Sequence, residues 1–136
     1  MKISSFIIGG DPVPYLRMTQ GEVKLMRIPD HKLRPGGLRI KTAIRRYFAY
    51  KDRVHIAAWA KRVDPEPKGK TYLNVMIYFR NRRHADPENV RKGIQDAIFS
   101  KDKMVAGGVD FDYDHENPRV EISVYEYESE RPLGQN

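Results

Sequence analysis

The sequence predicts a small α+β domain in which a mixed β-sheet of about four strands packs against two main helices. Segments rich in β-branched and aromatic residues alternate with two segments whose apolar residues recur at helical spacing. Clusters of proline and glycine separate these segments. The chain has 136 residues, with no interdomain linker, internal repeat or low-complexity tract. We therefore expect a single domain over residues 1–136 with a modest core.

The N-terminal third begins with a predicted strand at residues 2–9, where β-branched and aromatic residues end at two glycines. Two prolines at positions 12 and 14 then fix an extended exit from this strand. The next segment is polar and basic, and proline and glycine interrupt it. This composition predicts a mobile basic loop over about residues 19–37.

The longest helix is expected over residues 38–61, which contain neither proline nor glycine. Its apolar residues fall near helical spacing: Ile40, Ala43, Ile44, Tyr47, Phe48, Val54, Ile56, Ala57 and Trp59. A turn rich in proline follows at residues 63–69. Residues 70–80 are rich in β-formers and predict a central strand.

A second helix is expected to begin at Asp86 and Pro87, because aspartate is a favoured N-cap and proline suits the first helical position. Residues 103–106 predict a short strand, and the alternating pattern of residues 119–127 predicts a strand with one wet face. The tail at residues 128–136 is polar and is expected to fray.

Charge is distributed unevenly around the net value of +7. Up to Val105 there are 23 Lys/Arg and 10 Asp/Glu, a balance of +13, whereas the remainder has 2 and 8, a balance of −6. A basic body suits a polyanion such as nucleic acid, because its cations displace counterions from phosphates. A basic face that is merely solvated is the alternative.

Other classes of protein are disfavoured by composition. The chain has no cysteine, so it can form neither a disulfide nor a thiolate metal site. The apolar N-terminus is too short to span a membrane and has no signal-peptide pattern, which predicts a cytoplasmic protein without a membrane partner.

The stretch around Asp86 orders its charges in a way that suits phosphodiester chemistry. A basic run ending at His84 leads to Asp86 and Glu88, and Lys92 follows one turn after Glu88. Carboxylates at a helix N-terminus can hold a cation such as Mg²⁺ beside a phosphate. The alternative is ordinary capping by Asp86 with a surface pair between Glu88 and Lys92.

These residues resemble the core motif of the RusA-type crossover junction endodeoxyribonucleases, which resolve Holliday junctions. That motif is a basic run, Asp-x-Asp-Asn, a lysine three residues later, and Asp-Ala-Leu four residues after the lysine. The matching segments here are Asp86-Pro87-Glu88-Asn89, Lys92 and Asp96-Ala97-Ile98. Glu88 replaces the usual second aspartate, which keeps the charge and lengthens the side chain.

The resemblance implies a RusA-like fold and a metal-dependent nuclease with Mg²⁺, or Mn²⁺, as its only cofactor. Its catalytic residues would be Asp86, Glu88, Lys92 and Asp102, with the three carboxylates as metal ligands. Asp102 follows a connection that is shorter than in the family, and only one member of the usual acidic pair remains. The competitors for its place are Asp110, Asp112 and Asp114.

The resemblance also implies a homodimer that cleaves four-way DNA junctions at symmetric positions and needs no small-molecule cofactor. The basic residues expected to bind DNA are Arg17, Arg45, Arg46, Arg82, Arg83 and Lys92. Two alternatives remain open at this stage. The chain could bind nucleic acid without catalysis, or it could be a metal-dependent nuclease that acts on another DNA or RNA substrate.

Overall fold

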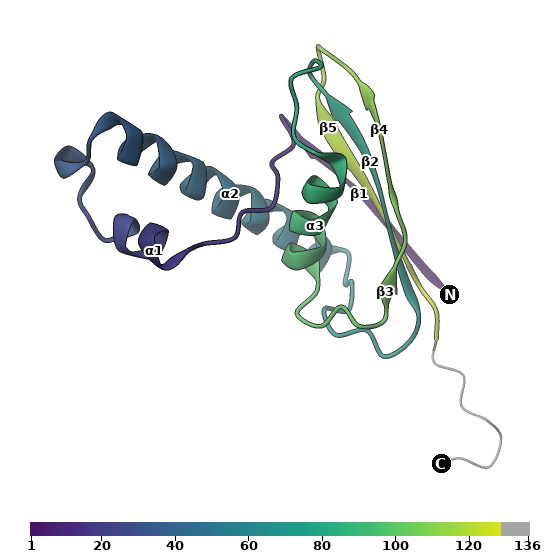
Figure 1. The fold of residues 1–136 in the computed structure, drawn as a ribbon. Coiled ribbons are helices and arrows are strands. Elements are labelled where there is room, and N and C mark those ends of the chain that lie inside the picture. The colour runs from purple at the N-terminus through teal and green to yellow at the C-terminus, as the bar shows by residue number, and fades with distance from the viewer. Residues whose placement is uncertain (129–136) are drawn as a thin grey trace.

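The computed structural model describes residues 1–128, which form three α-helices, one 3-10 turn and a five-stranded sheet (Figure 1). In chain order the elements are β1 (Lys2–Gly9), α1 (Gln20–Met26), the 3-10 turn η1 (Asp30–Lys32), α2 (Pro35–Ala60), β2 (Thr71–Phe79), α3 (Pro87–Ile98), β3 (Val105–Ala106), β4 (Val109–Tyr113) and β5 (Arg119–Glu126). The predicted α+β class is confirmed, with one strand and one helix more than expected. The predicted tail after Glu128 lies outside the described residues.

The sheet is mixed, as predicted, with the strand order β1-β5-β2-β3 and with β4 also paired to β2. β1 and β5 pair antiparallel, as do β5 and β2, whereas β3 and β4 run parallel to β2 along the same edge. Gly107 separates β3 from β4 and has a φ of +117°. A Cβ atom at Gly107 would lie 2.2 Å from the Leu73 carbonyl oxygen, so only glycine fits this break.

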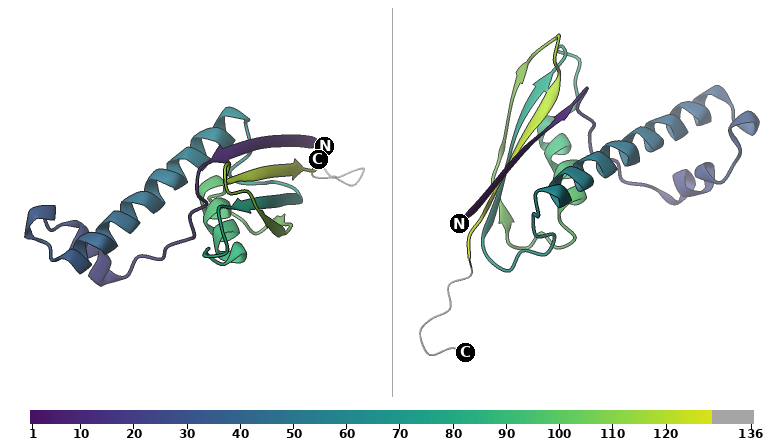
Figure 2. Two further views of the ribbon diagram at one scale, coloured as in Figure 1. Left: turned by 90° about the horizontal axis from the view of Figure 1, so that it is seen from above. Right: turned by 180° about the vertical axis from the view of Figure 1, so that it is seen from behind.

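Two helices cover one face of the sheet and enclose the core (Figures 1 and 2). α3 buries Val90, Ile94 and Ala97 against β2 and β5, whose alternate residues point to the same side. The C-terminal half of α2 packs beside α3 through Val54 and Ala58. No helix within residues 1–128 is long and apolar enough to cross a membrane.

The N-terminal half of α2 extends beyond the sheet, and α1 packs against it (Figures 1 and 2). We call residues 20–47, which comprise α1, η1 and this half of α2, the arm. The prediction of an irregular loop over residues 19–37 is therefore wrong for its helical parts. The side chain of Thr19 accepts a hydrogen bond from the Glu22 N–H and caps α1. Gly37, which the sequence suggested as part of a loop, lies in the first turns of α2 and faces Leu25 and Leu33.

β4 is the strand that the sequence did not predict. Its sequence, Val-Asp-Phe-Asp-Tyr, alternates apolar and acidic residues as a strand does. Four of the five residues are nevertheless exposed, and the two aspartates stood out in the sequence as candidate metal ligands. In the folded chain, β4 pairs with β2 over Val75–Phe79, and this pairing establishes the strand. Along α2, the apolar pattern also included Ile56 and Trp59, which are 63% and 76% exposed and do not belong to the core.

Candidate nuclease site

α3 begins where the sequence predicts. The Asp86 carboxylate accepts a hydrogen bond of 3.1 Å from the Glu88 N–H, and Pro87 occupies the first turn, where no backbone donor is needed. β2 ends shortly before this cap, so a central strand holds the start of the helix in place. The first turn of α3 therefore has a fixed position relative to the sheet.

One cavity of about 390 Å³ lies beside α3 and contains most of the predicted site. Glu88, Lys92 and Asp102 line it. The other lining residues are Tyr15, Arg91, Gln95 and Asp96. Glu88 and Lys92 are one turn apart on α3, whereas Asp102 comes from the connection between α3 and β3. The fold thus brings carboxylates from two segments to the same cavity as a lysine.

Asp86 does not line this cavity. Its carboxylate is directed to the backbone of its own helix as the cap. Among residues 1–128, no group of three or more His, Asp or Glu side chains is arranged to hold a metal ion. The structure therefore brings together two of the three carboxylates that the sequence grouped, and it places the third at the adjoining helix end.

A hydrogen-bonded chain fixes Asp102 and was not anticipated from the sequence. The Gln95 amide nitrogen donates to the Asp102 carboxylate at 3.0 Å, and the Arg91 guanidinium donates to the Gln95 amide oxygen at 2.9 Å. Arg91 also donates to the carbonyl oxygens of Leu73 and Ala106, at 3.0 and 3.1 Å. Because the strand pairing breaks at Gly107, these two carbonyls need a partner, and Arg91 supplies it.

This chain links the break in the sheet to the cavity. Burial lowers the pKa of the Arg91 guanidinium from its ordinary value, while the nearby Glu88 carboxylate opposes that shift. The guanidinium nevertheless stays charged at neutral pH. Gln95 could have been found in the sequence, since it lies seven residues after Glu88 and hence on the same helix face.

Tyr15, which also lines the cavity, contacts Lys92 through its ring. The Lys92 ammonium lies 4.5 Å from the centroid of the Tyr15 ring. The Tyr15 N–H donates to the Asn89 carbonyl oxygen at 3.0 Å, and the Asn89 amide donates back to the Tyr15 carbonyl oxygen at 3.3 Å. A Cβ atom at Gly93 would lie 3.2 Å from the Tyr15 nitrogen, so Gly93 permits this close approach. Asn89 therefore fixes the segment after β1 against α3.

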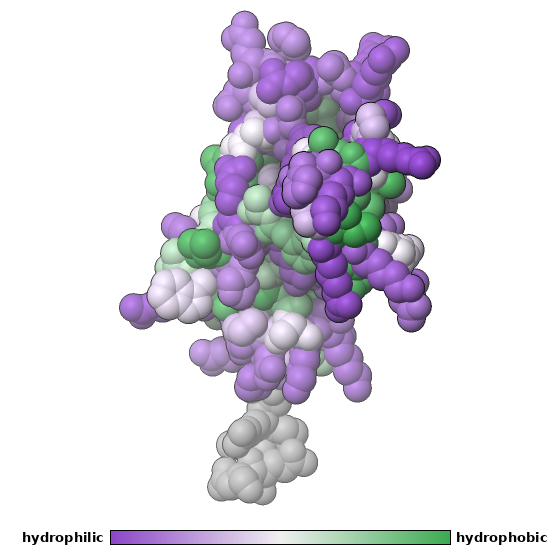
Figure 3. Space-filling model, turned by 90° about the vertical axis from the view of Figure 1, so that its left-hand side faces the viewer, coloured by the Kyte–Doolittle hydropathy of each residue, from purple (hydrophilic) through white to green (hydrophobic). Residues whose placement is uncertain are grey.

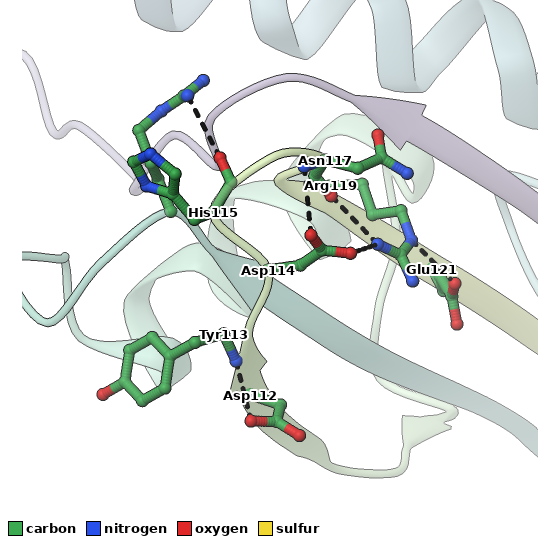
Figure 4. Close-up of polar contacts among 8 residues, drawn as sticks. Asp112, Tyr113, Asp114, His115, Asn117, Arg119 and Glu121 are labelled. Carbon is green, nitrogen blue, oxygen red and sulfur yellow. Dashed lines mark hydrogen bonds and ion pairs between the residues drawn. The ribbon is translucent and has the colours of Figure 1, made fainter.

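The competing aspartates of β4 lie elsewhere. Asp110 lines a separate pocket, together with Asn74, Glu121 and Ser123. Asp112 accepts a hydrogen bond from the Tyr113 N–H (Figure 4). Of the three competitors and Asp102, it is Asp102 that shares a cavity with Glu88.

Asp114 has a structural partner. Its carboxylate pairs with Arg119 at 2.8 Å, and Arg119 also reaches Glu121 at 3.0 Å (Figure 4). The Arg119 hydrogen bond holds the pKa of Asp114 below its usual range. Asp114 thus fixes the turn that leads into β5.

Five of the six predicted DNA-binding residues fall into three groups. Arg46 and Arg83 line a hollow of about 290 Å³ beside the β2–α3 loop, which also contains His84. Arg17 and Arg82 are exposed. Arg45 forms two hydrogen bonds with the Asp30 carboxylate, at 2.8 and 2.9 Å. The sixth predicted residue, Lys92, lines the cavity itself.

Substitution of Asp86 separates its capping role from any role of its charge. Asp86→Ala is expected to lower the free energy of unfolding by about 1 kcal/mol, because the cap is lost, whereas Asp86→Asn should leave it unchanged, because asparagine caps equally well. Chemical denaturation measures this difference. Cleavage by the Asp86→Asn variant then reports on the carboxylate alone: activity equal to that of the unmodified protein would restrict Asp86 to capping.

Comparison with known protein families agrees with this geometry. The model of the family described as endodeoxyribonuclease RusA matches residues 31–125, which is more than half of the chain and includes α2, α3, Asp102 and most of β5. A search of curated proteins finds no match. The chain belongs to the RusA endodeoxyribonuclease family.

Proposed function

We propose that the protein is a Mg²⁺-dependent endonuclease that cleaves four-way DNA junctions at symmetric positions as a homodimer. The family assignment supports endodeoxyribonuclease activity on junctions. The observation that carries the proposal is the shared cavity of Glu88, Lys92 and Asp102. A two-fold dimer would present one such cavity to each of two strands.

The carboxylates of this cavity fit a Mg²⁺ ion. Such an ion is commonly held by one or two carboxylates, with waters and substrate phosphates completing its coordination. Glu88 and Asp102 would hold it, with Asp86, the N-cap of α3, as a further ligand. Asp96, the other carboxylate that lines the cavity, is paired with Lys51 at 2.8 Å. When bound, the ion would polarise the scissile phosphate and lower the pKa of a water molecule.

The other residues of the cavity position these groups. Lys92 places a positive charge where negative charge grows on the phosphate during hydrolysis, which lowers the barrier. Tyr15 restricts the direction of the Lys92 ammonium. Gln95 and Arg91 fix the Asp102 carboxylate, as partners of metal ligands commonly do.

The proposal is tested with labelled four-way junction, duplex and single-stranded DNA, each incubated with and without Mg²⁺. We expect paired nicks at symmetric positions on the junction, and only with the metal. Tight binding without nicking, in both Mg²⁺ and Mn²⁺, would instead identify a protein that binds DNA without cleaving it. The position of Asp86 outside the cavity is the observation that favours this second function. Equal cleavage of all three substrates would identify a nuclease of different specificity.

Loss of the Gln95 amide tests the positioning of Asp102. Gln95→Ala is expected to raise the Mg²⁺ concentration for half-maximal cleavage by about 10-fold to 100-fold, because removing the partner of a metal ligand typically costs that factor. The rate at saturating Mg²⁺ should fall less. Metal titrations of single-turnover cleavage measure both quantities. An unchanged Mg²⁺ requirement would show that Gln95 only stabilises the fold.

A further inference from the structure

The arm, residues 20–47, is a basic surface distinct from the cavity. It extends from the body of the molecule, so much of it lies away from the sheet (Figures 1 and 2). In the view along the arm, hydrophilic side chains project around the tip of the arm (Figure 3). The arm contains eight Lys/Arg and two Asp/Glu, a balance of +6. The charge of this one segment, +6, is thus almost as large as the net charge of the whole protein, +7.

Most of these cations have no partner in the part of the chain that the structure describes. Within residues 1–128, six exposed cations of the arm form neither an ion pair nor a side-chain hydrogen bond: Lys24, Arg27, Lys32, Arg34, Arg39 and Arg46. Like charges that lie close together repel one another and destabilise a projecting segment, unless an anion neutralises them. The arm therefore favours a polyanionic ligand.

The two remaining cations hold the arm in shape. Lys41 is only 4% exposed; its ammonium lies 2.9 Å from Asp30 and also donates to the Ile28 carbonyl oxygen. Arg45 binds the same carboxylate through two hydrogen bonds. These contacts keep the pKa of Asp30 well below its usual range. Asp30 therefore stays ionised and ties η1 to α2, which presents the six other cations on a preorganised support.

The base of the arm leads to the candidate site. Arg46 lines the hollow that it shares with Arg83 and His84, directly before the Asp86 cap. In the same hollow, Arg80 is paired with Asp11 at 3.0 Å. The guanidinium groups of the hollow that have no ion pair within residues 1–128 are therefore those of Arg46 and Arg83. A basic surface thus continues from the arm to the β2–α3 loop.

The reach of the arm suits duplex DNA. Thirteen residues of α2, 35–47, span about 20 Å at the helical rise of 1.5 Å per residue. One turn of B-DNA spans about 34 Å, so the arm would extend along roughly half a turn. Over that length a duplex presents many phosphates.

We propose that the arm is a second DNA contact, which grips the phosphate backbone of the duplex leading away from the cleaved strand, about half a turn from the cut. This rests on the proposed function, because it takes DNA as the ligand of the cavity. A second copy of the chain fits the arm less well. In a two-fold contact through this surface, each basic arm would face its identical partner, and like charges would repel.

The test measures how binding depends on salt and on the length of the flanking duplex. Arg27, Arg34 and Arg39 are replaced together by Gln, and binding to a four-way junction in EDTA is followed by anisotropy at several salt concentrations. The slope of log K against log[salt] should become shallower by about 2 to 3, since each lost phosphate contact accounts for about 0.9. The matched control replaces Lys61, Arg62 and Lys68, cations beyond the opposite end of α2, and should leave the slope close to that of the unmodified protein.

A second set of measurements shortens the duplexes of the junction. A junction whose duplexes are shorter than half a turn should bind the unmodified protein and the triple variant alike, because the arm then has nothing to grip. Equal slopes for the unmodified protein and the triple variant on long duplexes would overturn the proposal. So would a change of molar mass in the triple variant, which would make the arm a subunit interface. Absence of cleavage in Mg²⁺ by the unmodified protein would overturn the proposed function instead, without affecting the EDTA measurement.

Discussion

Asp102→Asn is expected to lower the rate of junction cleavage by at least about 10²-fold, since a carboxylate that organises charge at the scissile phosphate is then lost. Glu88→Gln, in the same cavity, should have a comparable effect. Both substitutions preserve side-chain shape and remove a negative charge. Binding of the junction should therefore be retained or become tighter, because repulsion of the phosphates falls. Single-turnover cleavage and anisotropy separate these two quantities.

Asp110→Asn is the matched control for Asp102→Asn. The substitution is the same, and Asp110 was a competitor for the same role in the sequence. Its side chain lines the pocket with Glu121 and Ser123 rather than the cavity with Glu88. Cleavage by the Asp110→Asn variant should equal that of the unmodified protein. Loss of cleavage in this variant, with full activity in the Asp102→Asn variant, would transfer the site to β4.

Lys92→Met is expected to lower the rate of cleavage by about 10²-fold to 10³-fold, the usual cost of losing one group that stabilises charge in a transition state. Methionine keeps most of the aliphatic length of the side chain and removes the ammonium that lies over the Tyr15 ring, so α3 should remain intact. Junction binding should weaken only by the equivalent of one phosphate contact. Single-turnover rates at saturating protein report the chemical step.

Lys61→Met provides the comparison for Lys92→Met, because it removes a lysine from an exposed position at the end of α2. It should affect neither step. A large loss of affinity in the Lys92→Met variant, with an unchanged rate at saturating protein, would assign Lys92 to binding alone. Rates that fall in both variants would point to a general effect of charge.

Local signals predicted much of the fold. β1, β2 and β5 were found because each combines β-formers with a clear end, and α3 because Asp86 and Pro87 mark its start. α1 was missed because it is short and buries no residue, so its sequence has no strong apolar stripe. Its packing against α2, where Leu25 lies close to Gly37, is a property of the folded chain.

The candidate site was predicted in part, because some of its residues are related by local spacing and others are not. Glu88 and Lys92 lie on one helix face by spacing alone, and Asp102 was identified by its place before a strand. The spacing also grouped Asp86 with them, but its carboxylate serves the helix backbone. Arg91 was missed because its partners are carbonyl groups of β2 and β3, and no pattern of side chains reveals them.

The sequence by itself determined where α3 begins, which residues share its charged face, and that the chain has the RusA motif. These features depend on residues within a few turns of one another, whose geometry the helix fixes. Only the tertiary structure decided that Asp102 rather than Asp110 lies beside Glu88, and that the first half of α2 extends outwards with α1. Those placements depend on where the pairing of β3 and β4 with β2 breaks and on how far the sheet reaches along α2, which contacts between distant segments establish.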